Sequence, residues 1–146
     1  MISHMEQISE KNTKETWYIS FSVSNSLYAV ELSFVFRIIA IDQIHPVSEE
    51  TEYTLGKIKV DNTAWTVTDL RMKFGEKNPK YSRHPMGILL EYKEKKRCIL
   101  IDDVRSVFTT DSGSMTPPFW KNRYISGSMQ IEDRIVNFLS IDSLFD

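Results

Sequence analysis

The sequence predicts a mainly β fold of two small barrels packed together, with short helical turns. Three observations predict it. Apolar and polar residues alternate with period two in several segments, which is the pattern of half-buried strands. Residues typical of turns join these segments into pairs, as in β-hairpins. The same order of pairs and turns then recurs in the second half of the chain.

Size and charge limit the class of protein. The chain has 146 residues, of which 41% are hydrophobic and 26% are charged, so it resembles an ordinary globular domain or two small lobes that share a core. The 18 basic and 20 acidic residues give a net charge of −2, without the overall basic character expected of a nucleic-acid-binding protein. The sequence contains neither a membrane-spanning apolar run nor a signal-peptide core. We therefore expect a cytoplasmic protein that binds no nucleic acid and does not insert into a membrane.

The first elements are a polar lead-in and a hairpin. Residues 1–16 are rich in Ser, Glu, Lys and Asn and are expected to be flexible. Residues 17–32 alternate on both sides of the turn Ser24-Asn25-Ser26, which predicts two paired strands. Apolar residues in 34–39 then recur at a helix-like spacing, although their β-branched side chains leave a strand open.

A second hairpin and a helical turn complete the first half. Residues 58–68 alternate around Asp61-Asn62-Thr63, with one polar face. Leu70 and Phe74, four apart and followed by Gly75, indicate one helical turn with a glycine stop. Residues 75–85 form a polar linker with two prolines.

The second half begins with strands of a different kind. Residues 88–90 and 98–101 are continuous apolar runs around a charged turn. Continuous runs predict strands that are buried on both faces, so we expect them at the junction of the two lobes. A last hairpin over 128–139 and an apolar helical turn over 141–145 end the chain.

The two halves repeat. A shift of 71 positions pairs Tyr53 with Tyr124 and Gly56 with Gly127, and it continues through both later hairpins. Neither half is long enough for a sizeable core alone. We therefore expect a single domain over residues 17–146, with one lobe over about 17–83 and the other over about 84–146.

A family resemblance rests on motifs in both halves. The motifs are Tyr28-Ala29-Val30-x-Leu32-x-x-Val35-x-x-Ile38-Ile39, Gly56-x-Ile58-x-Val60, and Trp65-x-Val67-x-Asp69-Leu70-Arg71-x-x-Phe74-Gly75. In order and spacing they resemble the CheW-type chemotaxis coupling proteins. The resemblance extends over about residues 17–145 and includes the segments 98–107 and 124–144.

The resemblance implies a fold and a function. The fold is two five-stranded SH3-like barrels around a shared core. The function is that of a non-enzymatic scaffold, without a cofactor, that joins the regulatory domain of the histidine kinase CheA to the cytoplasmic helical hairpins of chemoreceptors. The resemblance places the receptor hairpin in a groove between the barrels, and the groove candidates are Val35, Ile38, Val104 and Val107. Barrel ends contact the kinase in this family, and the candidates here are Asn62, Glu132 and Asp133.

Two positions depart from the family pattern in opposite directions. Family members commonly have Glu where this chain has Arg37, and Arg where it has Asp61. We expect Arg37 and Asp61 to form an ion pair with its charges exchanged. An exposed pair of this kind adds about 0–1 kcal/mol to stability, so its expected role is the selection of a partner by surface charge.

Other chemistry receives little support from the residues. The three histidines are scattered and, with Cys98, lack metal-ligand spacing. Asp102-Asp103 and Glu132-Asp133 adjoin predicted strand ends, where capping is the simpler role than acid–base catalysis. Two alternatives to the coupling role remain open. One is a divergent adaptor in signalling that does not control motility; the other, less favoured, is an enzymatic or small-ligand β-barrel domain.

Overall fold

The computed structural model describes residues 15–47, 54–77, 79–117 and 122–145. The strands are β1 (Glu15–Val23), β2 (Ser26–Glu31), β3 (Val35–Ala40), β4 (Thr54–Val60), β5 (Thr63–Asp69), β6 (Met86–Tyr92), β7 (Lys95–Ile101), β8 (Asp103–Asp111), β9 (Ile125–Ile131) and β10 (Arg134–Leu139). The helical turns are η1 (Leu32–Phe34), α2 (Leu70–Lys73), η2 (Ser112–Ser114) and α3 (Ile141–Leu144). The mainly β prediction and all four hairpins are confirmed.

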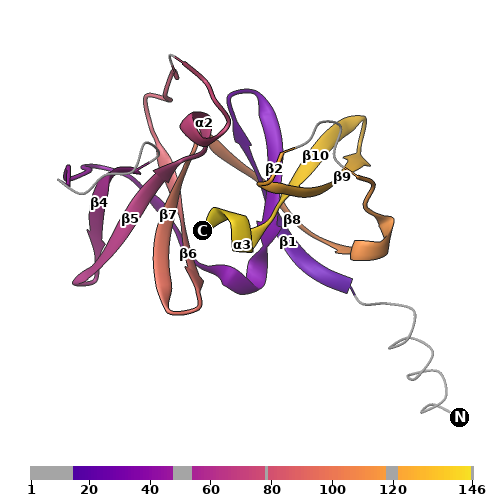
Figure 1. The fold of residues 1–146 in the computed structure, drawn as a ribbon, viewed down its shortest axis with the longest axis horizontal. Coiled ribbons are helices and arrows are strands. Elements are labelled where there is room, and N and C mark those ends of the chain that lie inside the picture. The colour runs from indigo at the N-terminus through magenta and orange to yellow at the C-terminus, as the bar shows by residue number, and fades with distance from the viewer. Residues whose placement is uncertain (1–14, 48–53, 78, 118–121, 146) are drawn as a thin grey trace, which may run out of the picture.

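The strands form two five-stranded sheets, each belonging to one lobe. Lobe A has the order β8-β1-β2-β10-β9, and lobe B has the order β3-β6-β7-β5-β4. The lobes lie side by side with α3 between them (Figure 1). The predicted boundary between residues 83 and 84 is wrong, because each sheet combines strands from both halves of the chain. The pair β1–β2 joins β8, β9 and β10, whereas β6–β7 joins β3, β4 and β5.

The strand order of the two lobes follows the repeat, although each lobe combines strands from both halves of the chain. If β1 to β5 are matched in order with β6 to β10, the strand order of one lobe becomes that of the other. In each lobe, the last strand of one copy of the repeat pairs parallel with the middle strand of the sheet. These parallel pairs are β10 with β2 in lobe A and β5 with β7 in lobe B. The internal repeat is therefore real, and its two copies contribute to both lobes.

Two expected boundaries shift. Strand β1 begins at Glu15 rather than at residue 17, and the rest of the predicted lead-in, residues 1–14, lies outside the described residues. The helix-like spacing after residue 33 produces only the short turn η1, and the chain then continues as β3. The β-branched residues of this segment favour the strand, since they fit a pleated surface better than a helix.

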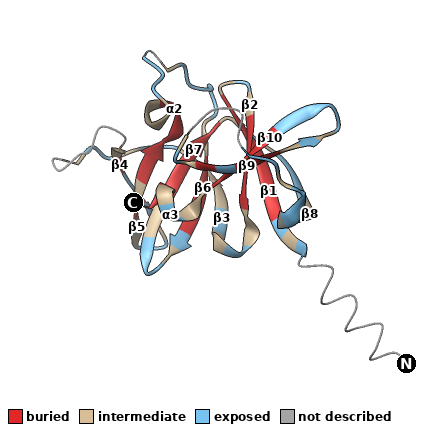
Figure 2. Cartoon of the chain, turned by 45° about the vertical axis from the view of Figure 1, so that its right-hand side comes forward, coloured by how far each residue is buried: buried red, intermediate tan, exposed pale blue. Residues whose placement is uncertain are grey.

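The core has three parts. The main cluster lies between the lobes and includes Phe21 and Val30 from lobe A and Ile88 and Ile99 from lobe B. Each lobe also has its own cluster, around Trp65 in lobe B and around residues of β2 and β10 in lobe A. Strands β6 and β7 alternate between the main cluster and the cluster of lobe B, so they are buried along most of their length (Figure 2). This confirms their predicted place at the junction.

The four hairpins share one turn geometry. Each turn has two residues with positive φ: Ser24-Asn25, Asp61-Asn62, Lys93-Glu94 and Glu132-Asp133. Two successive left-handed residues match the right-handed twist of the flanking strands, which fixes the register of the hairpin. Each hairpin therefore closes through a tight two-residue turn.

The glycine shared by the two halves has a steric role. Gly56 has φ +147, and a Cβ atom there would overlap the carbonyl oxygen of His45. His45 and Lys57 form an isolated bridge with two backbone hydrogen bonds of 2.8 Å, which brings the two segments together. In the repeat, Gly127 lies against Thr116, which bridges to Ser128 in the same way. Glycine is required because the incoming chain crosses directly over the strand.

Candidate partner-binding surfaces

The predicted groove residues lie on the edge strands β3 and β8. Val35, Ile38 and Val104 are half-buried and pack against the main cluster between the lobes. Val107 differs, because it is 49% exposed. It pairs with Ile19 of the main cluster, so its side chain lies on the junction face of lobe A. Three of the four groove candidates therefore border the main cluster, whereas the apolar side chain of Val107 is exposed to solvent.

Sequence reasoning missed an exposed tryptophan beside this face. Trp17 is 56% exposed, although alternation predicted it to be half-buried with the rest of β1. It pairs with Thr109, two residues along both strands from the pair Ile19–Val107. Trp17 and Val107 thus share one face of lobe A. Large exposed apolar side chains gathered on one face are typical of a contact surface.

The expected ion pair between Arg37 and Asp61 is present. The Nη2 atom of Arg37 lies 2.9 Å from Oδ2 of Asp61, with 46% and 72% of the two side chains exposed. The Arg37 guanidinium also lies over the ring of Phe36, 5.2 Å from its centroid. Phe36 in turn stacks on the buried Trp65, with ring centroids 5.4 Å apart. Phe36 therefore covers the buried Trp65 at this end of lobe B, and the Arg37–Asp61 ion pair lies beside Phe36.

The corresponding end of lobe A is open. The edge strands β3 and β8 each have a register shift at the same point, after Val35 and after Val104. Arg105 and Ser106 therefore take the places of Phe36 and Arg37. Ser106 and Ser20 are hydrogen-bonded through their hydroxyls at 3.0 Å, and Phe108 lies at the wall of the opening. A cavity of about 460 Å³ remains, lined by the predicted contact residue Glu132 among others. The other two barrel-end candidates, Asn62 and Asp133, are exposed in the hairpin turns.

A buried charge network was missed altogether. Arg71 of α2 has a fully buried side chain that forms ion pairs with Asp102 and, at 3.8 Å, with Asp69. Asp69 also caps α2 by accepting a hydrogen bond from the backbone N–H of Arg71 at 2.9 Å. The only available signal was the sequence Asp69-Leu70-Arg71 within a motif of the family resemblance. A basic residue in the last turn of a short helix otherwise indicates an exposed position.

The network joins the two lobes. Asp102 lies between β7 of lobe B and β8 of lobe A, and its Oδ2 accepts a hydrogen bond from the backbone N–H of Ser24 at 2.8 Å. Ser24 lies in the β1–β2 turn of lobe A, whereas Arg71 follows β5 of lobe B. Asp102 therefore links both lobes through one carboxylate, rather than capping the short turn that the sequence predicted for it.

Tyr81 covers the network from outside. Its hydroxyl donates a hydrogen bond to Asp69, and its ring lies 5.0 Å from the guanidinium carbon of Arg71. Burial, followed by the hydrogen bond to Asp69, raises the pKa of Tyr81 to about 12. Burial likewise raises the pKa of the Cys98 thiol to about 12, in the core of lobe B. Tyr81 lies over the charge network, whereas Cys98 lies in the apolar cluster of lobe B.

The described residues contain no group of three or more His, Cys, Asp and Glu side chains that could hold a metal ion. No helix in the part of the chain that the structure describes is long and apolar enough to cross a membrane.

Comparison with known proteins gives the family. Residues 18–146 match the model of the CheW-like domain. The chain belongs to the CheW-like domain family. A curated relative, the chemotaxis protein CheW of Klebsiella aerogenes, is 20% identical over 132 residues, which cover 87% of this chain and 80% of that protein. The scaffolding protein TtCheW from Thermoanaerobacter tengcongensis has a similar fold, with a TM-score of 0.80 at 22% identity over 90% of this chain and 92% of that one.

Membership of the CheW-like family bears on the class of function. The curated relative is named a chemotaxis protein and the solved relative a scaffolding protein, and membership of the family favours a scaffold over an enzyme for this chain. The two five-stranded lobes agree with the fold that the resemblance implied.

Proposed function

We propose that this CheW-like chain is a cytoplasmic scaffold that couples chemoreceptors to a CheA-type histidine kinase. The observation that carries the proposal is the junction between the lobes, where Val35, Ile38 and Val104 border one apolar core from two different edge strands. An amphipathic helix docks through a short row of apolar anchors of this kind. The proposed occupant is the cytoplasmic helical hairpin of a receptor, which would bring the scaffold to receptor arrays at the membrane.

The ends of the lobes are proposed to contact the regulatory domain of the kinase. Tight two-residue turns present Asp61-Asn62 on lobe B and Glu132-Asp133 on lobe A. The end of lobe B presents an exposed aromatic ring next to two charges, because Phe36 lies beside the Arg37–Asp61 pair. Charges at the rim of an interface govern partner choice more than affinity. The exchanged order of this pair would therefore select a kinase domain with matching charges.

The second candidate function is a divergent adaptor whose array does not control motility. It keeps the same fold and surfaces, and the exchanged charges at Arg37 and Asp61 are the feature that supports it. An enzymatic or small-ligand role has less support, since the strongly shifted groups lie in different surroundings, Tyr81 over the charge network and Cys98 in the apolar cluster of lobe B.

The test is a calorimetric titration with the regulatory domain of a CheA kinase from the same cell. We expect micromolar or tighter binding, weakened by Asp61→Arg because two arginines would then adjoin. The double exchange Arg37→Asp with Asp61→Arg restores an ion pair but reverses its order. Binding that returns with the double exchange would show that only the pair matters, whereas binding that stays weak would show selection by charge order. No binding at roughly 100 μM of a folded protein, a concentration well above micromolar affinity, would contradict the kinase partnership.

A further inference from the structure

Four basic side chains share one face of lobe B. Lys57 lies opposite Thr66 in the antiparallel pair β4–β5, and Thr66 lies beside Arg97 in the parallel pair β5–β7. Lys59 lies opposite Ala64 in the same way, and Lys95 precedes Arg97 by two residues on β7, as Ala64 precedes Thr66 on β5. Directly paired residues project to the same side of a sheet. These residues, Lys57, Lys59, Lys95 and Arg97, are called the basic face.

The strand order fixes the spacing of the charges. Strand β5 lies between β4 and β7 (Figure 1), and neighbouring strands are about 4.8 Å apart. The backbones of β4 and β7 are thus about 10 Å apart, with only Ala64 and Thr66 between the two columns of basic residues. No carboxylate is placed on β5 between the two columns.

The three lysines of the basic face are exposed and have no ion-pair partner among the described residues. Three carboxylates near this face have cations of their own, whereas Glu94, which precedes Lys95, is exposed and forms no ion pair with the described residues. Asp61 pairs with Arg37, Glu91 with Lys96, and Asp142 with Lys93. Arg97 donates a hydrogen bond of 3.4 Å to the carbonyl of Phe145 and stacks on its ring. Among the residues that the structure describes, no carboxylate therefore forms an ion pair with the three lysines.

The repeat shows that the fold does not require these charges. The matching positions in lobe A are Ser128, Gln130, Ser26 and Tyr28, none of which is charged. Lysines also protect edge strands from pairing with other chains, which could account for β4, an edge of its sheet. That role cannot account for Lys95 and Arg97, because β7 lies inside the sheet.

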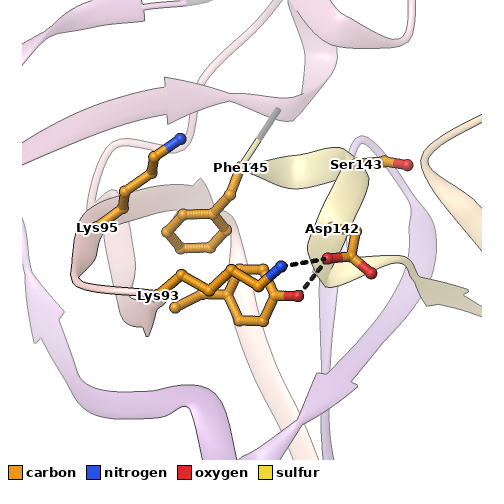
Figure 3. A pocket seen from close by; sticks show the side chains of 6 residues that line it. Lys93, Lys95, Asp142, Ser143 and Phe145 are labelled. Carbon is orange, nitrogen blue, oxygen red and sulfur yellow. Dashed lines mark hydrogen bonds and ion pairs between the residues drawn. The ribbon is translucent and has the colours of Figure 1, made fainter.

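The basic face continues into a pocket with an aromatic wall. The pocket has a volume of about 380 Å³ and is lined by Tyr92, Lys93, Lys95, Asp142, Ser143 and Phe145. Figure 3 shows Lys95 beside the ring of Phe145, with Lys93 directed to Asp142 on the other side. Lys95 belongs to both the basic face and the pocket, so one ligand can reach the two together.

We propose that the basic face binds an acidic segment of a partner protein, with carboxylates over the cations and a neighbouring side chain in the adjoining pocket. In an extended segment, residues three apart are about 10 Å apart, which matches the distance between the backbones of β4 and β7. The charge complementarity is local, since the chain as a whole carries −2. This inference goes beyond the coupling role and requires neither the kinase nor a receptor.

The test uses the full chain and a fluorescent peptide of glutamate pairs separated by single leucines. The control peptide has glutamine in place of glutamate. We expect fluorescence anisotropy to detect binding of the glutamate peptide only, with affinity that falls as salt shortens the Debye length from about 10 Å at 0.1 M. Amide shifts of residues 57–59 and 95–97 should follow the titration.

Matched variants separate the site from the overall charge. Lys57→Glu with Lys95→Glu should weaken binding at least roughly tenfold. Lys77→Glu with Lys80→Glu makes the same change in net charge at exposed positions outside the basic face and should weaken it less than about twofold. Equal weakening by both variants, or equal binding of the glutamine peptide, would overturn the proposal. Co-sedimentation with phosphatidylserine vesicles, without peptide binding, would overturn it in favour of a lipid. These outcomes are independent of the kinase titration, which tests the substitution of Asp61.

Discussion

Tyr81 lies over Arg71, with the ring centroid 5.0 Å from the guanidinium carbon, and both side chains meet the carboxylate of Asp69. The contact joins the connection after α2 to a charge network that also includes Asp102 and the first hairpin turn. The lobes are thus held together by a buried polar cluster as well as by the apolar core.

Removal of the Arg71 charge should destabilise the fold strongly. Arg71→Met leaves Asp69 and Asp102 without their cation, and the side chain of Asp69 is fully buried. Breaking one side of a buried ion pair costs about 3–5 kcal/mol. Urea denaturation should show this loss of unfolding free energy. The control Lys77→Met, at an exposed position, should stay within about 0.5 kcal/mol of the parent; a similarly small loss for Arg71→Met would contradict the role of the network.

The hydroxyl of Tyr81 should titrate abnormally and make stability pH-dependent. Its pKa is about 12 in the folded chain against 10.0 for the ordinary phenol, mainly because of burial. A raised pKa means that the folded state favours the protonated phenol. The stabilisation is therefore complete below pH 10 and is lost as the pH rises toward 12. Burial also raises the pKa of Tyr18 and of Tyr28, so ultraviolet titration of Tyr81→Phe should show one late-ionising tyrosine fewer than the parent, and the variant should have a weaker pH dependence of stability.

Substitutions at the groove should separate binding from stability. Val107 is 49% exposed, so Val107→Glu should change the unfolding free energy by no more than about 0.5 kcal/mol. Val35 packs against the main core, so Val35→Glu should cost about 1–3 kcal/mol as well. Both should weaken binding of a chemoreceptor cytoplasmic hairpin, measured by calorimetry. Unchanged binding by the folded Val107→Glu protein would exclude this residue from the groove.

The two glycines with positive φ should differ in their tolerance of alanine. At Gly56 a Cβ atom meets the backbone of His45, whereas at Gly75, with φ +85, nothing lies within 4 Å. Gly75→Ala adds only backbone strain of about 1–3 kcal/mol. Gly56→Ala would also push away the backbone of His45, which crosses over the strand at this point. It should therefore lower the melting temperature more than Gly75→Ala does. The reverse order would show that the crossing at His45 is flexible.

The sequence predicted the elements far better than their partners. Alternation and turn residues depend on local geometry, so hairpins such as β4–β5 and the turn at Leu70 were recognisable. The strand exchange was not predictable from the repeat, because equal halves can pair within or between themselves with the same pattern of residues. The boundary near residue 83 was therefore wrong even though the repeat was right.

The charged network was hidden for a different reason. Arg71 and Asp102 are 31 residues apart in the sequence. From its neighbouring residues alone, each is predicted to be an exposed charged residue near the end of a helix or strand. Only the three-dimensional fold makes Arg71 a buried residue. The Arg37–Asp61 pair was predictable because both residues depart from a family pattern at once, with opposite signs.

The exchange of strands makes the chain equivalent to a swapped homodimer whose two half-length subunits have been joined end to end. The joint is the segment after α2, residues 74–85, which leads from the first copy of the repeat to the second. A cut in this segment would leave two fragments that remain associated, since each lobe needs strands from both. Neither fragment could complete a lobe alone, so a gene encoding only half of the chain would have to supply two copies to obtain a fold.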